Sequence, residues 1–215
     1  MHRFAAAALA LTLSASTHAE ELEVNPDAGN NSFSAVFDAA LGERINAVSS
    51  AVGCRLRYDP ATGTASGRCS VPLSSVRVDN DDTKSDHFWQ WATNKKSDPA
   101  TCQLEASFEN VRIGTLAPER PAPFQAEIPF TVCGRKRADG RPEHVSGTAL
   151  LFPPGTYGSS KTIRVRATLT GFDRDAYRIG PAYTEGWLAR VQSLAKVVAE
   201  RGDVELSLFA RPATH

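Results

Sequence analysis

Apolar residues alternate with polar ones over eight short segments of this chain. A period of two places every second side chain on one side of an extended strand, which is incompatible with a mostly helical fold. The 13 prolines and 15 glycines lie mainly between these runs, as in 118–123 and 153–155. The alternating residues are Phe33, Ala35 and Phe37; Cys54, Leu56 and Tyr58; Cys69, Val71 and Leu73; Leu104, Ala106 and Phe108; Phe124, Ala126, Ile128 and Phe130; the run 145–152; Ile163, Val165, Ala167 and Leu169; and Val204, Leu206 and Leu208.

No regular series of ten-residue helical segments stands between these runs, and a parallel sheet would require one as its crossover connections. An antiparallel sheet of this size closes most easily into a barrel that is wide enough for one ligand. We therefore expect a mainly β protein, an antiparallel barrel of about eight strands. Residues 20–31 and 210–215 are expected to be loose tails.

Two segments have helical spacing instead. The first is short: Ser85 can cap it, and Phe88, Trp89 and Ala92 form one apolar side. The second is expected over 185–201, with Thr184 as N-cap and Gly202 as the terminator. Its apolar stripe consists of Trp187, Leu188, Val191, Leu194 and Val198. We expect this longer C-terminal helix to cover a seam or a mouth of the barrel.

The first 19 residues have the pattern of a secretory signal peptide. A basic start with Arg3 precedes an apolar stretch and a small-residue site that ends at Ala19. We expect cleavage after Ala19, a single domain over 20–215, and a periplasmic or secreted location. No other segment approaches the roughly 18 apolar residues of a membrane-spanning helix. Basic and acidic residues number 24 each, a balance that gives no attraction to nucleic acid.

Four cysteines in an exported chain indicate two disulfides, for which three connectivities are possible. Folding residues 54–69 about their central turn places Cys54 opposite Cys69. The next strands bring Cys102 near Cys133, although strict alternation puts these two on opposite faces, so we expect a bulge near Pro129. A four-cysteine zinc site would need a Cys-x-x-Cys spacing, which is absent.

The remaining polar clusters have ordinary structural interpretations. The acidic run 79–82 beside His87 lacks the glycine and terminal glutamate of a calcium loop, and it is typical of turn and capping chemistry. The basic residues 135–137 and Arg141 flank an Asp-Gly turn and are expected at a solvated hairpin tip. No nucleophile elbow, phosphate loop or metal-ligand spacing occurs. We expect neither an enzyme nor a bound metal or cofactor.

Three segments resemble the YceI family of bacterial periplasmic proteins. Residues 84–88 (KSDHF) are similar to the family's Arg-Asp-x-His-Leu helix motif, with His87 at the histidine position and Ser85 where the family has Asp. Residues 130–137 (FTVCGRKR) resemble the strand that ends in a glycine turn before basic residues, without the family's proline. Residues 172–180 (FDRDAYRIG) resemble a third family signature with its tail permuted.

The resemblance implies a lipocalin-like barrel that holds a long apolar lipid such as a polyisoprenoid. In such a barrel the inward residues would form the wall of a ligand cavity. The expected ligand-binding residues are Phe37, Leu56, Val78, His87, Phe88, Trp91, Leu104, Phe108, Ile128, Phe130, Phe152, Val165 and Phe172. His87 and Asp86 could contact a polar head group or form a helix-capping pair. The alternative is a disulfide-stabilised structural or interaction module whose barrel is filled by its own side chains.

Overall fold

Thirteen antiparallel strands form one hydrogen-bonded sheet in the computed structural model, which describes residues 18–184 and 198–213. The main order is β10-β9-β7-β5-β4-β1-β13-β12-β11-β8, and β2, β3 and β6 branch from β13. The strands are β1 (Glu20–Val24), β2 (Ser32–Ala39), β3 (Arg44–Ser49), β4 (Gly53–Asp59), β5 (Thr64–Pro72), β6 (Arg77–Val78), β7 (Gln103–Arg112), β8 (Ala122–Ile128), β9 (Phe130–Val132), β10 (Arg135–Lys136), β11 (Glu143–Phe152), β12 (Thr162–Asp173) and β13 (Val198–Pro212).

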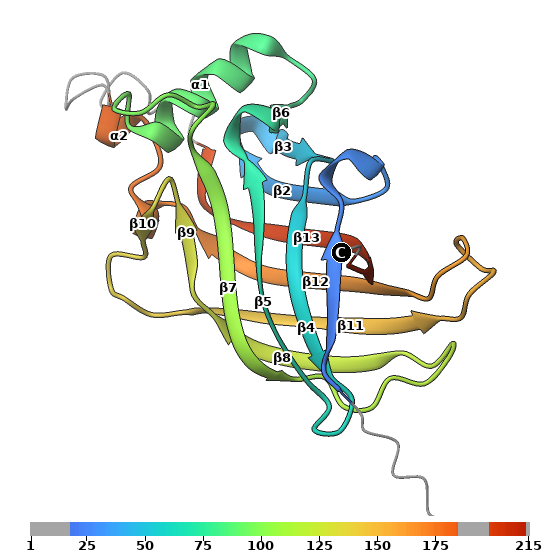
Figure 1. Cartoon of the computed structure of the whole chain (residues 1–215). Coiled ribbons are helices and arrows are strands. Elements are labelled where there is room, and N and C mark those ends of the chain that lie inside the picture. Colours follow the sequence, from blue (N-terminus) through green and yellow to red (C-terminus); the bar gives the residue numbers. More distant parts are fainter. Residues whose placement is uncertain (1–17, 185–197, 214–215) are drawn as a thin grey trace, which may run out of the picture.

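The sheet folds over into two layers that cross at a steep angle. Figure 1 shows β1, β4, β5 and β7 running across β8, β11, β12 and β13 behind them. The strands β1, β4, β5 and β7 of one layer and β8, β11, β12 and β13 of the other turn apolar alternate residues toward the space between the layers, as the period of two predicts. Helix α1 (Asp82–Thr93) lies at the end of the molecule where β3 and β6 also lie.

A closed barrel of eight strands is not confirmed. The hydrogen-bonded order ends at β8 and β10 and does not return on itself within the described residues. The reason lies at Pro129, where the segment 122–132 changes partner: β8 pairs with β11, and β9 pairs with β7. Proline has no backbone N–H to donate to a ladder, so a strand interior tolerates it at such a break.

All eight predicted runs contain strands, and three further strands, β1, β3 and β10, went unpredicted. The prediction of loose tails was wrong at both ends. Strand β1 lies between β4 and β13, where Leu22 and Val24 are buried, and β13 continues to Pro212. A five-residue strand with three glutamates carries only two apolar side chains, so its alternation is too short to be distinguished from a polar tail.

Both predicted disulfides, Cys54–Cys69 and Cys102–Cys133, are present. The first pair is directly opposed in the β4–β5 register. The second has a different geometry from the expected bulge, because Cys133 lies in the turn between β9 and β10 with a left-handed φ of 49°. A turn residue does not follow strand alternation, which removes the apparent conflict of faces.

Asp81, and not Ser85, caps helix α1. The Asp81 side chain accepts a hydrogen bond from the backbone N–H of Lys84 at 2.9 Å. Ser85 lies inside the helix, where its buried hydroxyl accepts from the N–H of Val78 and donates to the carbonyl of Asp81. The acidic run therefore provides turn and cap groups, as its composition predicts.

The expected helix over 185–201 falls mostly outside the described residues. A short helix, α2 (Pro181–Thr184), precedes that segment. After it, residues 198–201 belong to β13, so the helical assignment of Val198 was wrong. In the described part of the chain no helix is long and apolar enough to cross a membrane.

Removing the α1 cap should weaken the fold measurably. Asp81→Ala leaves the Lys84 N–H without its side-chain acceptor and should lower the free energy of unfolding by about 1 kcal/mol. Urea unfolding of Asp82→Ala is the matched control, because Asp82 makes only an exposed ion pair with Arg77, worth about 0.5 kcal/mol or less. Equal losses in the two variants would contradict the assignment of the cap.

Candidate ligand-binding site

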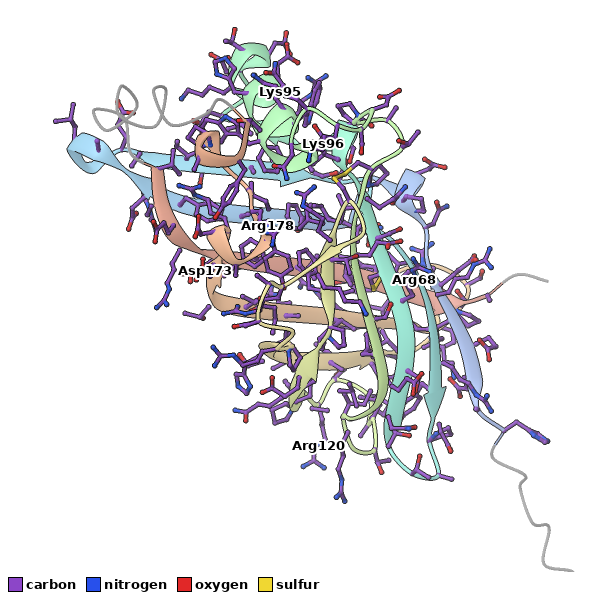
Figure 2. All side chains as sticks on the ribbon, turned by 90° about the vertical axis from the view of Figure 1, so that its left-hand side faces the viewer. Arg68, Lys95, Lys96, Arg120, Asp173 and Arg178 are labelled. Atoms are coloured by element: carbon purple, nitrogen blue, oxygen red, sulfur yellow. A yellow bond between two sulfur atoms is a disulfide. The ribbon has the colours of Figure 1, made fainter. Side chains whose placement is uncertain are left out.

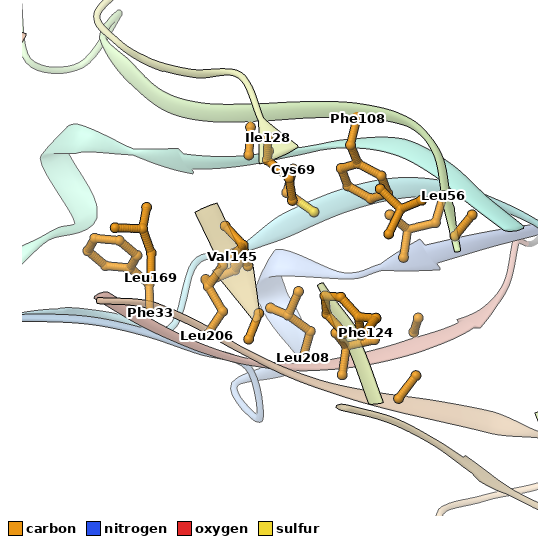
Figure 3. Close-up of a pocket in the computed structure, with 18 of the residues that line it drawn as sticks. Phe33, Leu56, Cys69, Phe108, Phe124, Ile128, Val145, Leu169, Leu206 and Leu208 are labelled. Atoms are coloured by element: carbon orange, nitrogen blue, oxygen red, sulfur yellow. The ribbon is translucent and has the colours of Figure 1, made fainter. Parts of the chain in front are cut away.

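An apolar cavity lies between the two layers of the sheet. Thirty residues line it, and only two of them, Arg57 and Glu143, are charged. Figure 3 shows Phe108 and Leu56 on one side of this space facing Phe124 and Leu208 on the other. The cavity has a volume of about 160 Å³.

Small side chains on the inner faces leave this space unfilled. Ala106 on β7 and Ala167 on β12 face inward, where larger residues would meet in the middle. Two glycines, Gly67 and Gly147, add no space to the cavity, because the side chain opposite packs over each of them. A Cβ on Gly147 would lie 2.6 Å from the Phe124 ring, and one on Gly67 would lie 2.8 Å from Leu56.

Inward side chains of strand β13 keep accessible surface inside the cavity. Val204 and Leu206 point inward and line the cavity, but both remain partly accessible. Neighbouring Leu208 and Ala210, on the same face, are buried. Interiors are normally packed to the density of organic crystals, so inward aliphatic residues with exposed surface indicate room for another molecule.

The disulfide Cys54–Cys69 belongs to the inner wall. Cys69 lines the cavity, and Cys54 beside it is buried. The bridge joins β4 to β5 and presents only sulfur and carbon to the interior. It therefore holds the wall without adding a group that would need a hydrogen-bonding partner.

One end of the cavity carries a satisfied polar cluster. Glu143, with 7% of its side chain exposed, accepts hydrogen bonds from the Tyr177 hydroxyl at 2.8 Å and from Arg137 at 2.9 Å. The Tyr177 ring stacks on Phe172 and meets the edge of Phe130. These aromatic rings close this end of the cavity. The Glu143 side chain behind them is already hydrogen-bonded to Tyr177 and Arg137.

Burial and the neighbouring carboxylate raise the pKa of Tyr177 far above that of a free phenol. A hydrogen bond to Glu143 also raises the pKa of Arg137, against the opposing effect of desolvation. Both shifts keep Tyr177 a neutral phenol and Arg137 a cation at neutral pH.

At the opposite end Tyr58 fixes the segment that follows β7. Its buried hydroxyl donates to the carbonyl of Gly114 at 3.1 Å and accepts from the N–H of Leu116 at 3.1 Å. The β4–β5 turn also contacts this segment, because the N–H groups of Ile113 and Gly114 both donate to the carbonyl of Gly63. These bonds hold Ile113 against the cavity.

Seven of the thirteen predicted ligand-binding residues line the cavity: Leu56, Leu104, Phe108, Ile128, Phe130, Val165 and Phe172. The other six lie elsewhere. Phe37 packs over Gly202 and near Phe172, and Val78 is buried against β3. Phe88 and Trp91 pack against the core from α1, Phe152 stands edge-on to Tyr157, and His87 is exposed on α1, as is Asp86.

Two of the four basic residues, Arg135 and Arg137, differ from the predicted solvated hairpin tip, whereas Lys136 and Arg141 are exposed as predicted. Arg137 is mostly buried against Glu143 and Asp139. Arg135 is half-buried and donates to the backbone carbonyls of Tyr177 and Ala92. Arg135 and Arg137 thus hold the aromatic end of the cavity in place. The local sequence could not predict this role for Arg135, because both of its partners lie more than 40 residues away in the chain.

Arg174 has a comparable fastening role in the segment 172–180. Its guanidinium donates to the carbonyls of Ile179, Ala199 and Val198 at 2.7–3.0 Å. Gly180 lies beside this group with a φ of 146°, a backbone conformation that other residues rarely adopt. Burial lowers the pKa of Arg174, which remains a cation at neutral pH.

The fold and the site together define a crossed two-layer antiparallel β protein with an internal apolar cavity. No family model matches the chain, and no curated protein matches its sequence. A solved structure does match: a polyisoprenoid binding domain from Saccharophagus degradans implicated in plant cell wall breakdown. The TM-score is 0.59 at 14% identity, covering 91% of this chain and 100% of that one. The likeness is one of fold.

The raised pKa of Tyr177 should make stability fall at alkaline pH. The phenol stays neutral in the folded state and ionises above about pH 10 when unfolded, so its contribution is complete below pH 10 and is lost as the pH rises further. Relative to Tyr177→Phe, the wild type should lose about 1.4 kcal/mol of unfolding free energy between pH 9 and pH 11. Urea unfolding at both pH values measures this.

The exposed Tyr157→Phe is the matched control for that comparison, since the Tyr157 ring is 42% exposed. A wild type and a Tyr177→Phe variant with parallel pH dependence would mean that the Tyr177–Glu143 hydrogen bond does not persist in solution.

Proposed function

We propose that this protein is an exported carrier that sequesters a long-chain apolar lipid, of the polyisoprenoid type, between its two sheet layers. The observation that carries the proposal is the cavity, in which 28 of 30 lining residues are uncharged. Such a wall can hold a hydrocarbon by apolar contact alone, at about 25 cal/mol per Å² of buried surface. The proposal also includes YceI-type kinship, which the fold likeness supports.

Export is part of the proposal. The N-terminal residues 1–19 have the composition of a cleavable leader, and the two disulfides are compatible with an oxidising compartment. A lipid with a long hydrocarbon chain is almost insoluble in such an aqueous space. A protein that encloses the chain would therefore allow it to be stored or moved between membranes.

The length of the hydrocarbon should control affinity. Each buried methylene group contributes about 0.8 kcal/mol, so each added CH₂ should tighten binding about fourfold until the cavity is full. Titrating the delipidated protein with neutral polyprenols of two, three, four and eight isoprene units measures the trend. Affinity that does not change with length would contradict binding within the cavity.

Filling the cavity should weaken binding without unfolding the protein. Ala106→Phe places a ring inside, beside Phe130 on the paired strand, and should weaken octaprenol binding at least about tenfold. The control is Ser107→Phe, which adds the same ring at the exposed neighbouring position. Native mass spectrometry of the purified proteins would also report any lipid retained from the producing cells.

Binding that survives in Ala106→Phe would place the lipid outside the cavity. A wild type that binds no polyprenol and carries no lipid would favour the alternative, a structural or interaction module held by its disulfides.

A further inference from the structure

A seam runs along one side of the cavity where β7 and β8 approach each other without a ladder. Strand β7 pairs with β9 only through Leu104, Glu105 and Ala106. Just below, the N–H of Ser107 donates to the carbonyl of Pro129 at 3.2 Å, and among the described residues no further β7–β8 backbone pairing follows. The lower half of this wall is therefore closed by side chains.

Two of those side chains separate the cavity from an outer groove. Ile113, just after β7, and Phe124, on β8, line both spaces. The Phe124 ring packs over Gly147, in the place that a side chain there would take. Because Phe124 borders both spaces, rotation of this one ring would connect the interior with the outside, whereas the paired walls would have to break backbone hydrogen bonds.

The outer groove has a different chemistry from the cavity. Its walls carry Arg112 and Arg166, both exposed, together with the hydroxyls of Ser146, Thr148 and Thr168. Neither guanidinium makes a hydrogen bond or ion pair within the described parts of the chain, and none of the described residues that line the groove is acidic. Unpaired guanidinium groups beside hydroxyl donors suit a phosphate-type anion.

We propose that the β7–β8 seam is the entry route of the lipid and that the outer groove binds a phosphate-type head group while the hydrocarbon lies in the cavity. This inference rests on the proposed function, which it narrows to anionic long-chain lipids. The groove and the cavity meet at Ile113 and Phe124, so one amphiphile can occupy both. The same groove could also accept free phosphate, which the experiment must distinguish.

The head-group site is tested with farnesol and farnesyl monophosphate, which share one C15 chain. The wild type should bind the phosphate at least about tenfold more tightly than the alcohol, a preference that weakens in high salt. Arg112→Gln with Arg166→Gln should remove this preference and leave farnesol affinity unchanged. The control is Arg120→Gln, since Arg120 is also exposed but projects away from the body of the protein (Figure 2) and does not line the groove.

The entry route is tested by binding kinetics with farnesol. Phe124→Ala should raise both the association and the dissociation rate several-fold, because the ring blocks the path in both directions. Phe108→Ala removes the same ring from a part of the wall that does not border the groove, and it should raise only the dissociation rate.

The possible failures are distinguishable. Farnesol that binds without any phosphate preference, or a preference that survives in the double arginine variant, would overturn the head-group site and leave the lipid-binding function standing. Inorganic phosphate that binds as tightly as farnesyl monophosphate would make the groove a free-anion site. Identical kinetics in Phe124→Ala and Phe108→Ala would overturn the route. A wild type that binds neither farnesyl probe would overturn both this inference and the proposed function.

Discussion

The change of strand partner at Pro129 determines much of this architecture. A continuous ladder would demand an N–H at every second position, and proline supplies none. The segment 122–132 can therefore pair with β11 before Pro129 and with β7 after it, which joins the two layers at one corner. The same change leaves the lower half of β7 without a partner in β8. The joining of the two layers and the unpaired seam between β7 and β8 thus both follow from the missing N–H of Pro129.

Small inward residues set the second constraint, because they leave a cavity that a filled core would not have. The aliphatic and aromatic side chains around the cavity therefore lack part of the packing contacts that a filled core would give them. The disulfides and the satisfied Glu143 cluster stabilise the walls independently of the interior, and a bound hydrocarbon would recover the missing contacts.

Alternation alone predicted the strands that form the cavity walls, since a period of two fixes which side chains share a face. The central turn of residues 54–69 predicted the first disulfide, whereas the second followed from the order of the strands, against their alternation. Alternation could not find β1, whose position between β4 and β13 depends on residues far away in the chain. The helix motif around His87 was selected by resemblance, but the contacts of α1 place His87 on the outside. Phe37 shares the face of β2 that was predicted to be inward, but its ring packs over Gly202 and does not line the cavity.

The distribution of charge around the cavity gives a bound amphiphile a direction. At the aromatic end Glu143 is buried, and Tyr177 and Arg137 already satisfy it, so this carboxylate would repel a phosphate and has little capacity to recruit a hydroxyl. At the seam the situation is reversed, because Arg112 and Arg166 are exposed and have no partner in the described chain. A hydrocarbon tail would gain contact wherever it lay, but an anionic head group would find the two guanidinium groups without partners at the seam. The head group is therefore expected at the seam, with the tail extending toward the rings of Phe130 and Phe172.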